Sequence, residues 1–204
     1  MTSILTGDII NSRNTDSNSW MPLLKETLNS VGKTPKTWEI YRGDSFQLEI
    51  KNPEQAFFFA IELKTILKKI KNLDVRIAIG IGSKNDDYKN ITEGSGEAFI
   101  NSGKAFDNLL KKQNLAIITP WQEIDKIFNT AFAISLLVMD NWTVNSADFI
   151  EMCLRNPNTT QKLIAKELNI SESSASERRK RAGLDEILQL EKLYRELINQ
   201  KINN

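Results

Sequence analysis

Two aspartates in the N-terminal half have the residue type and surroundings of a metal site. Asp8 closes an apolar run and precedes a polar turn, and Asp44 follows Arg42 and Gly43 between two further apolar runs. Two carboxylates can hold Mg²⁺ or Mn²⁺ against a triphosphate, where the ions activate a hydroxyl and stabilise leaving pyrophosphate. We therefore interpret both as metal ligands. The alternative is that Asp8 only caps the turn and that Asp44 is an ordinary hairpin residue.

The amino-acid composition excludes several other kinds of catalytic and metal site. The 204 residues contain no histidine and one cysteine, Cys153, which excludes histidine-based triads and predicts neither zinc nor haem. Cys153 lies in an apolar helical stretch and is predicted to be a buried, inert thiol. With 27 basic and 26 acidic residues the net charge is +1, so any nucleic-acid patch must be local. The start of the chain does not resemble a signal peptide and no apolar run could span a bilayer, so we expect a cytoplasmic protein without a membrane partner.

Hydrophobic periodicity predicts alternating strands and helices up to residue 120. Strands are expected at residues 3–10, 38–41, 46–50, 74–82 and 115–119, and helices at 20–31, 53–70 and 94–110. This order indicates an α+β fold, a ferredoxin-like palm (βαββαβ) with an added helix and strand. Its first and third strands are antiparallel neighbours, which brings Asp8 beside Asp44. On the 74–82 strand, Arg76 is predicted to face solvent, and Gly80 and Gly82 to mark a twist or bulge.

Four segments resemble, in order, parts of the catalytic domain of class III nucleotidyl cyclases. Residues 7–13 are similar to the first metal-binding strand and its triphosphate loop, and residues 42–44 to the hairpin with the second metal-binding aspartate. Residues 75–80 resemble the later Val-Arg-Ile-Gly-Ile strand, and residues 96–104 the glycine-led catalytic helix. The resemblance implies metal ligation by Asp8, the Ile9 backbone and Asp44, and nucleotide contacts from Asn11, Ser12, Arg13, Arg42 and Gly43.

The segment that resembles the catalytic helix departs from the cyclase pattern. With Gly96 as the anchor, Ile100 and Lys104 occupy the positions of the catalytic asparagine and arginine. An isoleucine cannot orient a ribose, and Lys104, the one catalytic candidate, is only a partial stand-in for the arginine fork. Nucleotide binding is therefore better supported than cyclisation, and the base of the nucleotide is left open.

A second resemblance covers nearly the whole chain. Residues 6–9 (Thr-Gly-Asp-Ile), 42–47 (Arg-Gly-Asp-Ser-Phe-Gln) and 102–103 (Ser-Gly) are followed by a C-terminal helix-turn-helix pattern. This combination resembles the SatD family, small bacterial proteins of about this length. The resemblance implies no particular activity.

The C-terminal third is predicted to be helical throughout. Around residues 160–182, Ala165 is small where two helices cross, Leu168 and Ile170 bracket a turn, and Ser171 can cap the second helix. We predict DNA contacts from that second helix, through Ser173, Ser174, Glu177, Arg178, Arg179 and Arg181. The alternative is a helical interaction domain with a solvated basic run. The last helix, 184–202, either forms a homodimer seam or packs on the helix-turn-helix.

These patterns divide the chain into a palm domain (1–120), a helical linker (121–141) and a helix-turn-helix domain with a C-terminal helix (142–204). Two functions are consistent with the division. The first is a bacterial regulator, whose palm binds a metal and a nucleoside triphosphate and tunes DNA binding. The second is an active nucleotidyl cyclase or transferase, with the helical domain used for targeting. A structural palm with DNA binding alone is a third possibility, and residues 100 and 104 favour the regulator over the enzyme.

Overall fold

A five-stranded mixed sheet forms the centre of the N-terminal part. The computed structural model describes residues 1–85, 87–109 and 113–203. The strands follow the order β2-β3-β1-β4-β5, and they are β1 (Thr2–Ile10), β2 (Trp38–Tyr41), β3 (Ser45–Ile50), β4 (Asp74–Gly82) and β5 (Leu115–Ile118). Strand β1 is antiparallel to both β3 and β4, and β5 is parallel to β4. The predicted α+β class and the antiparallel pairing of the first and third strands are confirmed.

Helices surround the sheet and make up the whole C-terminal part. They are α1 (Ser17–Val31), α2 (Ala56–Lys68), α3 (Glu97–Asp107), α4 (Gln122–Met139), α5 (Val144–Arg155), α6 (Gln161–Glu167), α7 (Glu172–Arg181) and α8 (Leu184–Asn203), with short 3-10 turns at Ser12–Asn14, Pro53–Gln55 and Ile91–Glu93. The helix predicted at 94–110 begins only at Glu97, because Gly96 has φ 117°. Its predicted end, Leu110, lies outside the described residues.

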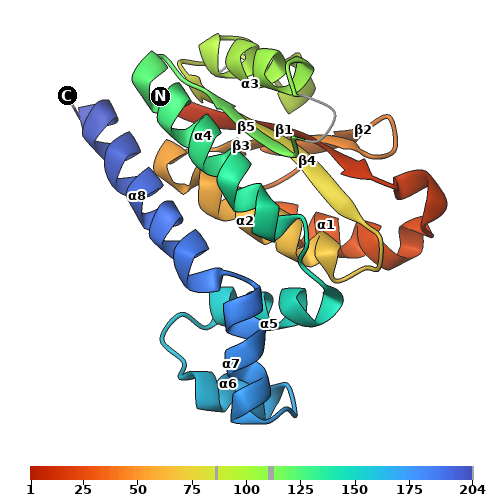
Figure 1. Cartoon of the computed structure of the whole chain (residues 1–204). Coiled ribbons are helices and arrows are strands. Elements are labelled where there is room, and N and C mark those ends of the chain that lie inside the picture. Colours follow the sequence, from red (N-terminus) through yellow and green to blue (C-terminus); the bar gives the residue numbers. More distant parts are fainter. Residues whose placement is uncertain (86, 110–112, 204) are drawn as a thin grey trace.

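Because side chains alternate along β1 and β4, successive residues face two different helical layers. Helix α3 lies over one face of the sheet, and α1 and α2 lie over the other (Figure 1). Odd-numbered residues such as Leu5, Ile77 and Ile79 belong to the large core beneath α1 and α2, whereas Ile4 and Ala78 pack with residues of α3. Asp8 and Arg76 are even-numbered and therefore belong to the α3 face.

Glycine 80 allows α3 to lie directly on β4. A Cβ atom at Gly80 would be 2.1 Å from the Ser102 nitrogen and 2.3 Å from the Ala98 oxygen. Two hydrogen bonds hold the helix there, from Asn101 to the Ile81 oxygen (2.8 Å) and from Thr6 to Ser102 (3.1 Å). Gly80 therefore provides a close helix–strand approach, where the sequence alone had predicted a twist or bulge.

A buried ion network joins α2, the start of β4 and the end of α4. Lys64, 4% exposed, bonds to Asp74 at 2.7 Å and to Asp140 at 2.6 Å. Lys68 bonds to the other Asp74 oxygen at 2.8 Å, and Asn114 donates to Asp140 at 3.0 Å. The buried carboxylate of Asp74 and the partly buried one of Asp140 are thus each paired with a lysine, which is the condition for charges to be tolerated inside a protein. The network fixes the end of α4 beside the sheet.

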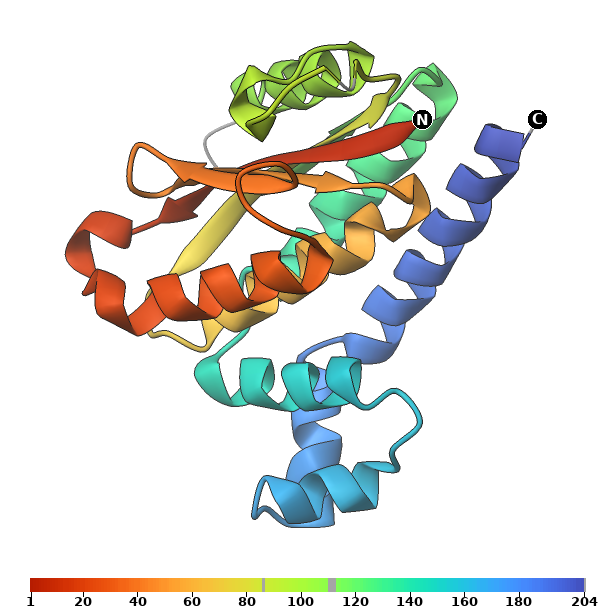
Figure 2. The ribbon, with the colours of Figure 1, turned by 180° about the vertical axis from the view of Figure 1, so that it is seen from behind.

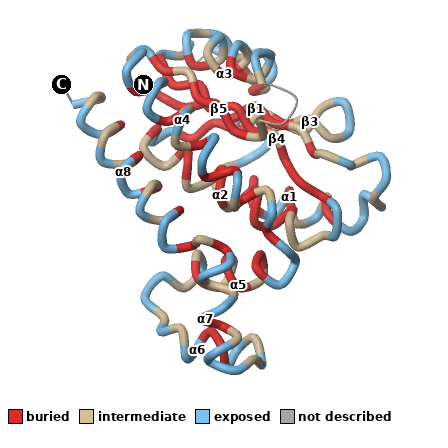
Figure 3. Tube along the Cα trace, viewed as in Figure 1, coloured by how far each residue is buried: buried red, intermediate tan, exposed pale blue. Residues whose placement is uncertain are grey.

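Helices α5, α6 and α7 form a separate layer at one end of the molecule (Figure 1). Thr160 caps α6, and Ser171 caps α7 by accepting from the Ser174 amide at 3.1 Å, as predicted. Ala165 and Ala175 are buried between the helices, and the Ile170 amide donates to the Ala165 oxygen across the turn. Figure 3 shows that most of the remaining surface of α6 and α7 is exposed.

The last helix packs on the N-terminal part of its own chain. Figure 2 shows α8 running beside the sheet layers, with both termini far from α6 and α7. Tyr194, fully buried, contacts Phe57 of α2 and Phe128 of α4, and its hydroxyl donates to the Pro53 oxygen at 3.1 Å. The helix also contacts α7, where Asp185 bonds to Arg179, but most of its buried apolar side chains pack on the N-terminal part, which neither predicted alternative named. The predicted linker, α4, also contributes Phe132 to the core.

Cys153 is a buried free thiol, which confirms the prediction. Burial raises its pKa to about 11, so the thiol is protonated at neutral pH. Among the helices that the structure describes, none combines the length and apolar character needed to cross a membrane.

The packing at Gly80 can be tested against Gly103 of the same helix–strand pair. Gly80→Ala should lower the free energy of unfolding by about 2 kcal/mol or more, because the new methyl meets backbone atoms of α3. Gly103→Ala meets no atom within 4 Å and should be neutral or stabilising by about 0.5–1 kcal/mol. Urea denaturation measures both. Equal effects of the two substitutions would contradict the close approach of α3.

Candidate functional site

An open groove of about 440 Å³ lies where β1 ends, between the β2–β3 hairpin and β4. Its volume is within the range of about 300–1,000 Å³ usual for small-molecule sites. The described residues that line it come from β1 and its following turn, the start of β3, β4 and the segment before β5. They are Asp8, Ile9, Ile10, Asn11, Ser12, Arg13, Asn14, Asp44, Arg76 and Asn114.

Asp8 is held by Arg76 across the β1–β4 pair. The two residues are directly opposite in the antiparallel register, on the α3 face. Arg76 Nε donates to Asp8 Oδ1 at 2.9 Å, and Arg76 Nη2 donates to Asp8 Oδ2. The hydrogen bonds to Asp8 raise the pKa of Arg76 further, and its guanidinium lies 5.6 Å from the Phe106 ring centre. The Arg76 side chain is 40% exposed, so it faces solvent as predicted, but it is also the bonded partner of the candidate metal ligand, which the sequence did not indicate.

Asp44 reaches the same groove from the other side of β1. Its main-chain oxygen accepts from the Ile9 amide at 3.1 Å, which ties the hairpin to the end of β1. Its side-chain Oδ2 accepts from Ser12 Oγ at 2.6 Å. Asp8, in β1, and Asp44, in the turn immediately before β3, therefore lie close together at one end of the sheet, as predicted, but each carboxylate is already oriented by a residue of the chain.

The turn after β1 presents donors to the groove. Asn11 has φ 66°, a left-handed conformation that asparagine tolerates, and its side chain donates to the Asn72 oxygen at 2.8 Å. This bond and the one from Ser12 to Asp44 fix both ends of the turn. The amides of Ser12 and Arg13 donate to no group in the part of the chain that the structure describes. Free amides beside an arginine are suited to an anion.

Three predicted residues lie outside the groove lining. Arg42 and Gly43 form the exposed hairpin tip, with φ values of 54° and 89°. Lys104 is exposed on α3, as is Ile100 at 55%. Asn101, the residue after Ile100, donates to the Ile81 oxygen of β4. The groove thus brings together the metal and turn residues without a catalytic side chain from α3.

The donor set limits what metal the groove could hold. Within residues 1–85, 87–109 and 113–203, no group of three or more acidic or cysteine side chains is placed to bind an ion. Two carboxylates and the Ile9 carbonyl would fill three of about six positions around an octahedral Mg²⁺, and the other half of the shell would be completed by water or phosphate. Asp8, Asp44 and the Ile9 carbonyl are the groups here that would hold a divalent ion, and by themselves they are an incomplete ligand set.

Arg76 and Asn114 are groove residues that sequence reasoning did not assign. The antiparallel register of β1 and β4 was a usable signal for Arg76, because it places an acid opposite a base on two otherwise apolar strands. Asn114 gave no such signal. It precedes a short strand, and its position depends on Asp140, which is 26 residues away in sequence.

The residues predicted to contact DNA divide into two groups on α7. Ser173, Glu177 and Arg181 are exposed. Arg179 instead forms a two-pronged bond with Asp185 of α8, with Nη2 to Oδ1 at 2.6 Å. Arg178 donates to the Asn145 oxygen of α5 at 3.3 Å, and Ser174 interacts with the capping Ser171. Arg178 and Arg179 thus hold α7 against its neighbours, whereas Arg181 pairs with Glu177 of its own helix.

Comparison with known proteins identifies the family. The sequence model of the SatD family matches residues 3–198, so the chain belongs to the SatD family. A search of curated proteins finds no match.

The Asp8–Arg76 pair can be measured by a double-mutant cycle. Asp8→Asn and Arg76→Gln should each lower the free energy of unfolding, and the double variant should lose less than the sum. The expected coupling is about 0.5–1 kcal/mol, because Arg76 is 40% exposed and the pair is partly screened. Urea denaturation of the four proteins gives the value. Strict additivity would show that the pair does not form in solution.

Proposed function

We propose that this SatD-family protein is a regulator that binds a metal–nucleotide complex in the candidate groove and binds DNA through α6 and α7. The observation that carries the first half is the convergence of Asp8, Asp44 and the Ser12–Arg13 amides on one groove. Carboxylate oxygens can ligate a metal ion and free amides can bind an anion, so a metal-bound phosphate is suited to both.

The strand order supports the palm interpretation. Among the first four strands the order is β2-β3-β1-β4, the arrangement of a split βαβ ferredoxin-like sheet, and β5 extends it beside β4. This strand order supports a framework like the one on which the resembling cyclases carry their metal and nucleotide. The strand order supports nucleotide binding only through its similarity to the cyclases, and the side chains and amides of the groove support it independently.

Charge in the groove favours phosphate over a bare metal. The side chains of Asp8 and Asp44 are opposed by those of Arg13 and Arg76, so the described lining is balanced before any ligand binds. A divalent cation alone would add positive charge beside Arg76. A cation together with a triphosphate brings its own compensating charge, and Arg13 is exposed and able to contact it.

The second half of the proposal rests on α6, its turn and α7. The turn is closed by the Ile170 amide and the Ser171 cap, so α7 is positioned as a unit. Its exposed face contains Ser173, Ser176 and Lys180, at helical spacing that puts them on one side. Small hydroxyls near a helix start and a lysine near its end are suited to base edges and phosphates respectively.

Cyclisation is not part of the proposal. The positions at which cyclases carry their catalytic asparagine and arginine hold Ile100 and Lys104, and both side chains are exposed away from the groove lining. Binding without turnover suits a sensor, whose ligand must persist long enough to bias the DNA-binding part.

The nucleotide site is tested with Asp44→Ala. This variant removes one carboxylate and should weaken Mn²⁺-dependent binding of ATP or GTP at least tenfold, measured by isothermal titration calorimetry. Asp107→Ala removes an exposed carboxylate of α3 outside the groove and serves as the matched control. A titration curve for Asp44→Ala that matches wild type would remove the site from consideration.

The proposed DNA-binding face is tested by comparing substitutions of an exposed cation of α7, Lys180, and of a cation bonded within the protein, Arg179. Lys180→Ala should weaken binding of a fluorescent duplex at low salt and lower the salt slope by about 1, as expected for one lost phosphate contact. Arg179→Ala should instead lower the melting temperature, because it breaks the bond to Asp185.

Lys192→Ala, an exposed lysine of α8, is the control for the loss of one positive charge. If Lys180→Ala and Lys192→Ala reduce DNA affinity equally, the effect is a general charge effect, and α7 is not the contact surface.

A further inference from the structure

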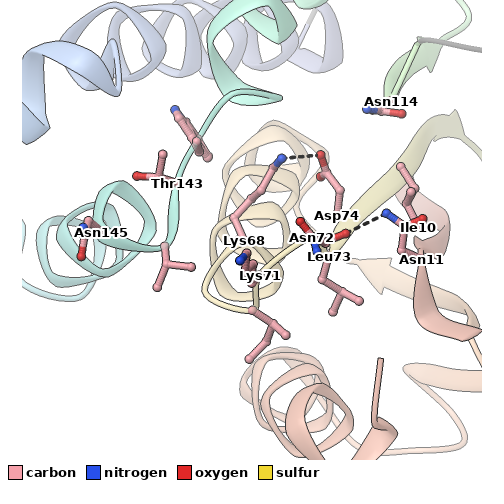
Figure 4. Close-up of a pocket in the computed structure, with 13 residues that line it drawn as sticks. Ile10, Asn11, Lys68, Lys71, Asn72, Leu73, Asp74, Asn114, Thr143 and Asn145 are labelled. Carbon is pink, nitrogen blue, oxygen red and sulfur yellow. Dashed lines mark hydrogen bonds and ion pairs between the residues drawn. The ribbon is translucent and has the colours of Figure 1, made fainter. Parts of the chain in front are cut away.

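A second groove, of about 570 Å³, lies at the junction of the sheet and the helical part. Figure 4 shows its walls, which come from the end of β1, the connection between α2 and β4, and the first turn of α5. It shares Ile10, Asn11 and Asn114 with the candidate site but is otherwise built from different residues. We call it the junction groove. Eight of its thirteen lining residues are polar.

Among the charged side chains that line the junction groove in the described part of the chain, the one without a bonded partner is a lysine. Asp74, the acidic residue of the lining, is bonded by Lys64 at 2.7 Å and Lys68 at 2.8 Å. Lys68 also donates to the Asp140 oxygen, so its ammonium is committed. Lys71 is exposed and bonds to no residue that the structure describes. An anionic group on a ligand would meet this lysine without competing with an internal partner.

Two asparagines supply oriented acceptors. The Asn11 amide nitrogen donates to the Asn72 main-chain oxygen at 2.8 Å, and the Asn114 amide nitrogen donates to the Asp140 carboxylate at 3.0 Å. Both partners only accept, so the NH₂ groups must face them and the side-chain oxygens are left for other donors. A ligand that carries hydroxyl or N–H groups would satisfy these oxygens.

We propose that the junction groove binds a phosphorylated hydroxylated ring, that is, a sugar phosphate or a nucleoside monophosphate. The phosphate contacts Lys71, and ring hydroxyl or N–H groups contact the free oxygens of Asn11 and Asn114. The apolar wall formed by Ile10, Leu73 and Trp142 covers the carbon skeleton. The volume is in the usual range for such ligands.

Binding here would act on the helical part through α5. Asn145 lines the groove, and its main-chain oxygen accepts from Arg178 of α7 at 3.3 Å. A ligand that contacts the Asn145 side chain would hold the first turn of α5 against the sheet and with it the anchor of α7. The effect on DNA affinity rests on the proposed function, whereas ligand binding in the groove does not.

Calorimetric titration with ribose 5-phosphate, AMP and inorganic phosphate tests the proposal on the full chain. We expect ribose 5-phosphate, AMP or both to bind more tightly than phosphate, and the pattern identifies which kind of ring is preferred. Lys71→Gln and Asn145→Ala should each weaken binding about tenfold, since both change exposed groove residues. Lys25→Gln, an exposed lysine of α1, should have no effect. Ligand should also slow amide exchange in residues 144–147.

Asp44→Ala separates this proposal from the nucleotide site. The variant should leave titration with ribose 5-phosphate and AMP unchanged, because Asp44 does not line the junction groove. Absence of binding by all three probes would overturn the proposal, as would binding that survives both Lys71→Gln and Asn145→Ala. Binding abolished by Asp44→Ala would also overturn it, because the ligand would then occupy the candidate site.

Discussion

The register of β1 between β3 and β4 determines which charged groups can meet in this protein. Strand β1 is paired along both edges, with Asp8 opposite Arg76 on one side and Ser45 on the other. Because side chains alternate, a slip of one residue would turn Asp8 into the core beneath α1 and α2. Leu5 and Ile9 occupy that core and make such a slip costly, since it would expose them. The packing of apolar side chains on one face of β1 thus determines the register, and the register determines which charged side chains meet on the other face.

The candidate groove and the helical part are connected through a few buried or partly buried contacts. Asn114 lines both grooves and bonds to Asp140, which ends α4 immediately before the segment that enters α5. Lys64 ties the same Asp140 to the start of β4. From the other side Tyr194 fixes α8 to the sheet layers. A displacement at the sheet edge would therefore be carried to α5 through the Asn114–Asp140 bond, and the single core gives little freedom for independent movement.

The sequence predicted local features better than the contacts that cross the molecule. The strand at 74–82 was predicted with its observed bounds because apolar alternation and flanking polar residues are both local signals. The Ser171 cap and the neighbouring positions of Asp8 and Asp44 followed from spacing and topology. The surface covered by α8 could not be predicted, because heptad spacing shows that a helix has an apolar face and not which partner it covers.

The same limit explains the errors and omissions at the sites. The bond between Arg76 and Asp8 was not predicted, because a strand taken by itself gives no information on its cross-strand partner, and the register of β1 against β4 is needed to find it. A basic run on α7 suggested free cations, but Arg179 is bonded to Asp185 six residues later, around the bend between α7 and α8. Asn114 and Lys64 act through residues distant in sequence, and neither is part of a motif.

Anomalous scattering from a crystal soaked with Mn²⁺ and a nucleoside triphosphate tests the central claim most directly. The account predicts a manganese peak between the carboxylates of Asp8 and Asp44, with phosphate density at the Ser12 and Arg13 amides and Arg76 still beside Asp8 or turned toward the phosphate. Nucleotide density elsewhere in the molecule, with no manganese at the two aspartates, would contradict it.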